Sequence, residues 1–384
     1  MQNLGFEIFD ILTRAQLTSS AIYIVAKLRL ADYLKDGPKS VEDLAEKTKT
    51  HPDSLYRLLR MLSSIGIFAE TIKEGEEQQQ VDHSIRQFEL TPMASLIQSD
   101  AKNSISNFAL MFGLESFKYA IDDLLYSIQT GENSFKHANG LDMYEYLKRN
   151  QKEGQIFNNA MASLTSSVTP LISDMYDFSQ FNTIIDIGGG QGVLLSSILK
   201  DNPKLYGVLF DLPYAIQSAK EHYGGQSANS NEKIKQDISS RCKLVEGDFF
   251  KSIPTTAADG YIIKNVILNW DDQSAAIILK NCLQAMKDGS SAIGSENQTN
   301  RKNTTHKLLI IDTIMPEGNE PFIGKFTDIF MLALTHKGRI RTEEEFRKLL
   351  SSSGFEITGI IRSHDPSNPF SIIEAIPSKS RSLE

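Results

Sequence analysis

The sequence predicts an α/β protein with a doubly wound parallel sheet in its C-terminal half and a helical region in front of it. Three observations carry this prediction. An apolar run at 184–187 leads into a glycine-rich turn at 188–192, strand-like and helix-like segments alternate from residue 181 onward, and two short helical patterns near residue 50 precede a hairpin pattern. Strand, tight turn and helix in this order form the ligand-binding corner of an open α/β sheet.

The N-terminal region, residues 1–100, begins with apolar residues at helical spacing up to about residue 35. Ser40, followed by acidic residues, predicts the N-cap of a helix over 41–48. A second helix is expected over 54–62, then a strand from 66–68 and a returning strand at 88–91. Two helices followed by a two-stranded wing predict a winged-helix domain.

Residues 101–180 are predicted to form a helical segment rich in aromatic residues. Most of these aromatic side chains are expected in the core, and some could line a pocket for a flat substrate.

Residues 181–384 are predicted to form a Rossmann-like domain, because strands and helices alternate along them. Strands are expected at 184–187, 205–210, 242–245, 260–266 and 308–312, helices at 192–200, 272–287 and around 343–350, and a terminal hairpin at 355–361 and 370–376. The polar tracts 224–240 and 289–306 are expected to be surface loops.

Bulk composition excludes several classes of function. The net charge of −8 argues against nucleic acid or an anionic membrane as the main partner. No apolar run is long enough to cross a membrane, and the N-terminus lacks a basic signal-peptide region. Two cysteines form no disulfide framework, so the expected location is the cytoplasm. No spacing of Cys, His and carboxylate residues predicts a metal site.

The charges around the glycine-rich turn discriminate between cofactors. Nicotinamide, flavin and S-adenosylmethionine enzymes all use such a turn, in which Gly188 and Gly190 occupy the first two glycine positions. The third position of a dinucleotide fingerprint is Val193, and Asp186 at the strand end would repel a phosphate. S-adenosylmethionine carries a sulfonium and an ammonium but no phosphate, so the sequence favours it.

Two further acids follow the next two strands. Asp211 ends the second strand, at the position from which a carboxylate accepts hydrogen bonds from ribose hydroxyls. Asp248 follows the third strand and is expected to accept from the adenine amino group, with Phe249 or Phe250 against the ring. Three acids at three successive strand ends predict an adenosyl site.

The chain resembles the homodimeric S-adenosylmethionine-dependent small-molecule O-methyltransferases of the caffeic acid and hydroxyindole type, particularly their bacterial natural-product branch. The resemblance spans nearly the whole chain. Its motifs are the segments 186–192, 210–213, 247–250, 264–266, 270–272 and 341–343. It implies a class I methyltransferase domain, a homodimer built by the N-terminal helices, and a small-molecule substrate. It also implies that Asp211 with Leu212, Asp248 and Lys264 bind the cofactor.

The sequence departs from this family at the catalytic base. The family's histidine corresponds to Leu268, which cannot accept a proton, and the glutamates that flank the histidine correspond to Asp312 and Ile340. Three residues are hypothesised to replace the base: Asp312 at the end of a strand, His137 in the helical segment, and His336 in a loop that faces substrate in the family.

The preferred hypothesis is methyl transfer to a small aromatic or polyketide-like molecule, by proximity or with a non-standard base. The alternative is a methyltransferase fold that catalyses a non-methylating reaction, such as a pericyclic step, a decarboxylation or a hydroxylation. There S-adenosylmethionine would act as an electrostatic element. A winged-helix DNA-binding regulator is disfavoured, because helix 54–65 offers only Arg57 and Arg60 to a nucleic acid.

Overall fold

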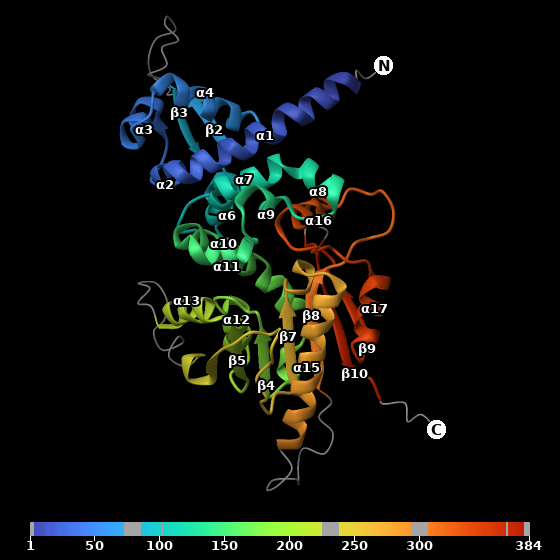
Figure 1. Ribbon diagram of the computed structural model, residues 1–384. Helices are drawn as coiled ribbons and strands as arrows, with labels where there is room; N and C mark the ends of the chain where they lie inside the picture. Colours follow the sequence, from blue (N-terminus) through green and yellow to red (C-terminus); the bar gives the residue numbers. More distant parts are fainter. Residues whose placement is uncertain are drawn as a thin grey trace, which may run out of the picture. The chain divides into compact units, whose positions relative to one another are not determined.

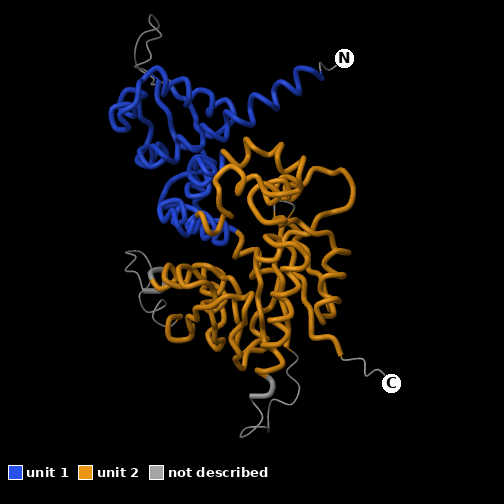
Figure 2. Tube along the Cα trace, viewed as in Figure 1, with its two compact units in different colours: residues 1–118, 147–167 blue, residues 119–146, 168–384 orange. Residues whose placement is uncertain are grey.

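The structure, a computed structural model, describes residues 4–72, 86–101, 103–224, 238–292, 306–365 and 368–379. The chain divides into two compact units (Figure 2). Unit 1 comprises residues 1–118 and 147–167, and unit 2 comprises residues 119–146 and 168–384. The segment 101–180, which the sequence treats as one helical region, is therefore shared between the two units.

Unit 1 contains the predicted winged-helix arrangement. Helices α3 and α4 precede the antiparallel pair β2–β3, in which Phe68 lies opposite Leu90, and β1 adds to the free edge of β3. The bounds are α1 Leu4–Leu28, α2 Leu30–Tyr33, β1 Lys39–Ser40, α3 Val41–Thr48, α4 Pro52–Ser63, β2 Phe68–Ile72 and β3 Arg86–Leu90. Ser40 caps α3 as predicted. Helix α4 begins two residues before the predicted start, because His51 serves as its N-cap and Pro52 favours the first turn.

Short helices follow the wing. They are α5 Pro92–Ser95, α6 Ser106–Phe112, α7 Glu115–Asp122, α8 Leu124–Thr130, α9 Ser134–Asn139, α10 Met143–Arg149 and the long α11 Gln151–Met175. Helices α8 and α9 lie in unit 2, as does the first half of α10, and both α8 and α9 contact α16 (Ile323–Leu334) there.

Unit 2 is built on a seven-stranded sheet with the order β6-β5-β4-β7-β8-β10-β9 (Figure 1). Its strands are β4 Thr183–Ile187, β5 Tyr206–Asp211, β6 Cys242–Glu246, β7 Gly260–Lys264, β8 Lys307–Thr313, β9 Phe355–Arg362 and β10 Phe370–Pro377. Strands β4 to β8 are parallel, and the β9–β10 hairpin is antiparallel, as predicted. The strand order reverses beside β4, which makes the carboxyl end of β4 the expected ligand-binding crevice.

Helices cover both faces of this sheet, so alternate strand residues enter two different cores. Ile185 and Ile187 pack in the core formed with α15 (Asp272–Ala292) and α17 (Glu343–Ser352), whereas Ile184 packs in the core formed with α12 (Val193–Asp201), α13 (Pro213–Gly224) and the end of α11. Helices α13 and α16 were not predicted, and α15 continues past its predicted end at residue 287. Residues 225–237 and 293–305 of the two polar tracts lie outside the described residues.

Candidate cofactor and active site

The glycine-rich turn joins β4 to α12 through left-handed backbone conformations. Gly188 has φ +70° and Gly190 has φ +59°. A Cβ atom on Gly188 would lie 2.7 Å from Val266 Cγ2, so packing and conformation both require glycine there. A Cβ atom on Gly190 would meet nothing within 4 Å, so Gly190 leaves open space beside the turn.

Asp211, the last residue of β5, links this turn to β5 through a hydrogen bond. Its Oδ2 accepts a hydrogen bond from the Gly190 N–H at 2.8 Å, and its Oδ1 accepts one from the Leu212 N–H at 2.6 Å. Burial raises the pKa of Asp211, and the two N–H donors oppose that rise. Each oxygen retains acceptor capacity, as binding a ribose hydroxyl requires.

Asp186 and Lys264 place opposite charges at neighbouring strand ends. Burial raises the pKa of Asp186 to about 7, opposed by the positive charge of Lys264. Burial lowers the pKa of Lys264 to about 8, opposed by Asp186 and Asp312. Within the described residues Asp186 Oδ1 has no hydrogen-bond partner. A buried carboxylate oxygen that has no protein partner and lies beside a glycine turn fits a cationic ligand and would repel a phosphate.

Asp248 and the two phenylalanines after it form the next part of the site. Asp248 Oδ1 accepts from the Phe250 N–H at 3.0 Å, and Phe249 would contact a Cβ on Gly188 at 3.6 Å. The Phe250 ring meets Trp270 edge-on, with centroids 4.6 Å apart. A carboxylate with aromatic rings beside it suits a purine.

Tyr144 was not singled out from the sequence. It comes from α10 and lies nearly parallel to Trp270, with ring centroids 6.2 Å apart and planes 23° apart. Burial raises the pKa of Tyr144, and the nearby Tyr214 and Asp211 raise it further. Tyr144 therefore lies near the carboxylate that holds the glycine turn. Helical spacing alone could not show which way its ring points.

Leu268, the residue expected at the position of the family's histidine, is an apolar residue. Leu268 is 8% exposed and sits in the short helix η3 (Ile267–Asn269). Asp312 Oδ1 accepts from the Thr313 N–H at 2.8 Å, and the backbone N–H of Leu268 is among the groups that lower the pKa of this carboxylate. Burial raises the pKa of Asp312 to about 7, against these donors and the charges of Arg341 and Lys264. Among the described residues, Asp312 Oδ2 has no partner.

The two histidines have other neighbours. His137 Nδ1 lies 2.6 Å from Asp123 Oδ2, and its half-exposed ring stacks on Tyr126 at a centroid distance of 3.9 Å. His336 is exposed in the turn after α16. Partial burial raises the pKa of Asp271. Hydrogen bonds from Ser274 and the charges of His336 and Lys337 outweigh this effect and hold the pKa below its usual range. Of the three residues hypothesised to replace the base, Asp312 is the one whose pKa the Leu268 N–H affects.

The fold is that of a class I S-adenosylmethionine-dependent methyltransferase domain: its parallel strands reverse their order beside a glycine turn, and carboxylates lie at or just after the ends of three neighbouring strands. The chain belongs to the O-methyltransferase family. Residues 121–356 match the O-methyltransferase domain, and residues 7–100 match the O-methyltransferase dimerisation domain. The protein is thus an S-adenosylmethionine-dependent O-methyltransferase that assembles as a homodimer.

Known proteins resemble the chain over almost its whole length. The phenazine O-methyltransferase PhzM of Lysobacter antibioticus is 37% identical over 359 residues, which cover 94% of this chain and 92% of PhzM. The crystal structure of LaPhzM matches with a TM-score of 0.81 at 34% identity, covering 97% of this chain and 99% of that one. The aclacinomycin 10-hydroxylase RdmB of Streptomyces purpurascens is 27% identical, covering 93% of this chain and 87% of RdmB.

In the part of the chain that the structure describes, no helix is long and apolar enough to cross a membrane. Within the same residues, no group of three or more His, Cys, Asp or Glu side chains could hold a metal ion.

Proposed function

We propose that this enzyme methylates an acidic hydroxyl of a small, flat aromatic natural product, with Asp312 as the proton acceptor in place of the family's histidine. One observation carries the proposal. Leu268 is the residue that we assign to the histidine position, and its N–H is among the groups that lower the pKa of the buried Asp312 carboxylate. Among the described residues, Asp312 Oδ2 has no hydrogen-bond partner. The phenazine O-methyltransferase among the relatives supports a flat, polycyclic aromatic acceptor.

The residues of the site fit S-adenosylmethionine. Asp211 and Leu212 would hold the ribose, Asp248 and Phe249 the adenine, and Gly188, Gly190, Asp186 and Lys264 would surround the methionine part. The bound cofactor supplies a methyl group on a positively charged sulfur. The unpartnered oxygen of Asp186 suits that cationic end of the ligand.

The apolar residue at the base position indicates how acidic the hydroxyl group of the substrate has to be. A simple phenol has a pKa near ~10, so about one molecule in a thousand is ionised at pH 7. General-base help is worth roughly 10²–10⁴ in rate, and positioning can supply an effective molarity of ~10⁵ M or more. Asp312, with a pKa of about 7, is matched to an acceptor more acidic than phenol. The acceptor oxygen forms its bond to the methyl carbon as the carbon–sulfur bond breaks, and the hydroxyl proton passes to Asp312.

A second function is favoured by the same apolar position. An enzyme without the histidine could use the bound sulfonium only to stabilise negative charge during a pericyclic step, a decarboxylation or a hydroxylation. One relative of this chain, RdmB, is named as an aclacinomycin 10-hydroxylase and not as a methyltransferase.

The experiment that separates the two functions counts products. Purified enzyme is incubated with S-adenosylmethionine and a panel of hydroxylated phenazines, naphthoates and anthraquinones. The proposal predicts one S-adenosylhomocysteine for each acceptor consumed and a product heavier by one methyl group. Acceptor turnover without S-adenosylhomocysteine would establish the second function.

A further inference from the structure

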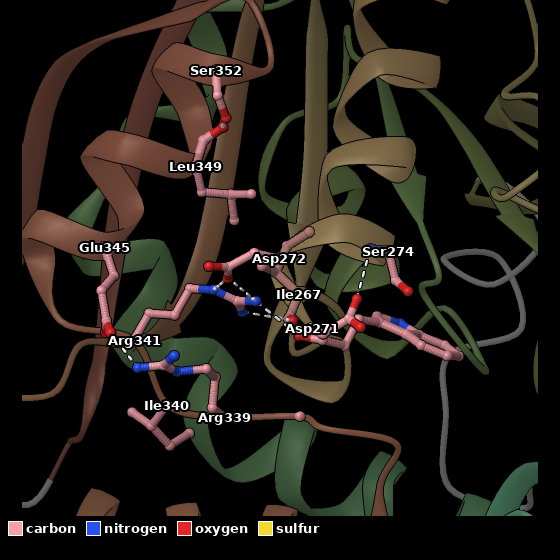
Figure 3. A network of polar contacts seen from close by, with 12 residues as sticks. Ile267, Asp271, Asp272, Ser274, Arg339, Ile340, Arg341, Glu345, Leu349 and Ser352 are labelled. Carbon is pink, nitrogen blue, oxygen red and sulfur yellow. Dashed lines mark hydrogen bonds and ion pairs between the residues drawn. The ribbon is translucent and has the colours of Figure 1, made fainter.

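Arg341 is a fully buried cation bound to the turn that carries Leu268 (Figure 3). Its guanidinium donates from Nη1 to the Ile267 carbonyl at 3.0 Å and from Nη2 to the Trp270 carbonyl at 2.8 Å. Its Nε donates to Asp272 Oδ1 at 2.9 Å. The Arg341 side chain is 0% exposed, whereas that of Asp272 is 61% exposed. The cation is therefore the buried member of the pair.

The two hydrogen bonds from Arg341 to backbone carbonyls reach the first and the last residue of the 267–270 turn. Burying a charge is unfavourable unless its donors are engaged, and the planar fork of arginine can reach two carbonyls that a lysine ammonium could not hold together. The two carbonyls belong to the residues directly before and two positions after Leu268. We call this pair of hydrogen bonds, from Arg341 to the Ile267 and Trp270 carbonyls, the clasp.

The backbone around Arg341 is fixed as well. The Arg339 N–H donates to the Leu268 carbonyl at 2.8 Å, and the Met315 N–H donates to the Arg341 carbonyl at 2.8 Å. Thr342, the next residue, caps α17 through a reciprocal capping box with Glu345. The segment 339–342 is therefore a rigid base from which the guanidinium reaches the turn.

The turn also acts on Asp312. Asp312 Oδ1 accepts the Thr313 N–H at 2.8 Å, and the N–H of Leu268 in the turn is among the groups that lower the pKa of this carboxylate. The charged groups that act on Asp312 are Lys264 on the adjacent strand β7 and Arg341. The same guanidinium therefore binds the turn that carries the Leu268 N–H, and its charge is one of two positive charges that act on Asp312.

We propose that Arg341 is a positioning residue for methyl transfer. It holds the 267–270 turn, and with it the backbone of Leu268, in a fixed conformation next to the proposed proton acceptor, and it provides positive charge for that carboxylate. The inference rests on the proposed role of Asp312 as proton acceptor. A residue that served stability alone would leave the pH dependence of the reaction where it was.

Two substitutions separate the clasp from the charge. Arg341→Met removes both, and we expect the pH of half-maximal kcat/KM to rise by about one unit, because a carboxylate that loses a cationic neighbour is harder to ionise. Arg341→Lys keeps the charge, so that pH should rise less than in Arg341→Met, while kcat falls and the KM for S-adenosylmethionine stays unchanged. Arg347→Met is the matched control, since Arg347 is an exposed arginine of α17 that pairs with Glu343; it should leave all three values unchanged.

Trp270 gives a readout that needs no turnover. It is the only tryptophan of the chain, and its carbonyl is held by Arg341. Both Arg341 variants should move its emission maximum to longer wavelength in the folded protein, and Arg347→Met should not.

The outcomes decide the proposal. Wild-type emission together with a wild-type pH profile in Arg341→Met would overturn it. If Arg341→Met does not fold, Arg341→Lys decides, and wild-type kcat with wild-type emission overturns the proposal. Asp312→Asn identifies a failure of the proposed function instead: a wild-type pH profile in that variant removes Asp312 as acceptor, while the emission of Arg341→Lys still tests the clasp.

Discussion

The Gly190 N–H donates a 2.8 Å hydrogen bond to Asp211 Oδ2. This bond joins the glycine turn after β4 to the end of the neighbouring strand β5. The carboxylate expected to bind ribose therefore also shapes the turn expected to surround the methionine part of the cofactor. Removing its charge should disturb both halves of the site.

Asp211→Asn should weaken cofactor binding by about 10- to 100-fold, since a hydrogen bond to a charged group contributes roughly 1.5–3 kcal/mol. Isothermal titration with S-adenosylhomocysteine measures the change. Asp177→Asn is the control, because Asp177 Oδ1 also accepts a backbone N–H, that of Ser179 at 2.9 Å, at the start of a short helix before β4. Equal affinities for the two variants would contradict the role of Asp211.

Gly190→Ala should separate folding from binding. Alanine at a φ of +59° costs about 1–2 kcal/mol in stability, yet nothing within 4 Å would clash with the new methyl group. We expect a folded protein that binds S-adenosylhomocysteine at least tenfold more weakly, since the methyl group would project into space the ligand needs. Gly140→Ala has the same strain, with φ +79° and nothing within 4 Å, but lies after α9. It should lose stability and keep its affinity; a similar loss of affinity in both would refute the placement of the ligand.

Asp186 should make the free enzyme less stable as the pH rises. Its pKa in the folded protein is raised from 3.8 to about 7. Its contribution to stability is therefore present below pH ~4 and lost as the pH rises through about 7. The melting temperature of Asp186→Asn should fall less than that of the wild type between pH 5 and pH 7.5.

A cationic ligand reverses this dependence, because it favours the ionised carboxylate. The affinity of the wild type for S-adenosylmethionine should rise between pH 6 and pH 8, by up to about tenfold per pH unit for one titrating group. Titration calorimetry at both pH values tests this. An affinity that is independent of pH in this interval would contradict the pairing of Asp186 with the ligand cation.

Leu268→His should restore a base in the family's position, next to Asp312. For an acceptor with the acidity of simple phenol, we expect a gain in kcat/KM within the 10²–10⁴ range of general-base catalysis, and for a strongly acidic hydroxyl little change. Leu268→Met, an apolar substitution of similar volume, is the control and should gain for neither acceptor. A histidine variant that favours neither acceptor would show that Leu268 does not face the reacting oxygen.

Local patterns predicted several strands, the glycine-rich turn and the wing, whereas the cofactor-binding residues stay a prediction. The strand ends, the glycine turn and the wing follow from apolar runs, turn residues and caps within a few positions of each other, as at Ser40 and Gly188. Helix α16 was not predicted, because its N-cap residue, Phe322, makes no side-chain capping hydrogen bond and the sequence therefore carries no start signal there.

Contacts between distant segments were not predictable from patterns. Arg341 reaches the Ile267 and Trp270 carbonyls over more than 70 residues of chain, and the raised pKa of Asp312 arises from burial beneath that turn. Periodicity in the aromatic segment likewise did not show that Tyr144 would lie beside Trp270, or that His137 would pair with Asp123.

The most direct test of the account is the pH dependence of kcat/KM for an acidic aromatic hydroxyl, measured for the wild type and for Asp312→Asn under saturating S-adenosylmethionine. The account predicts that the wild-type rate rises with a midpoint near the Asp312 pKa of about 7. It predicts that the variant is slower by roughly 10²–10⁴ and lacks this rise. A variant with the wild-type rate and the wild-type midpoint would contradict it.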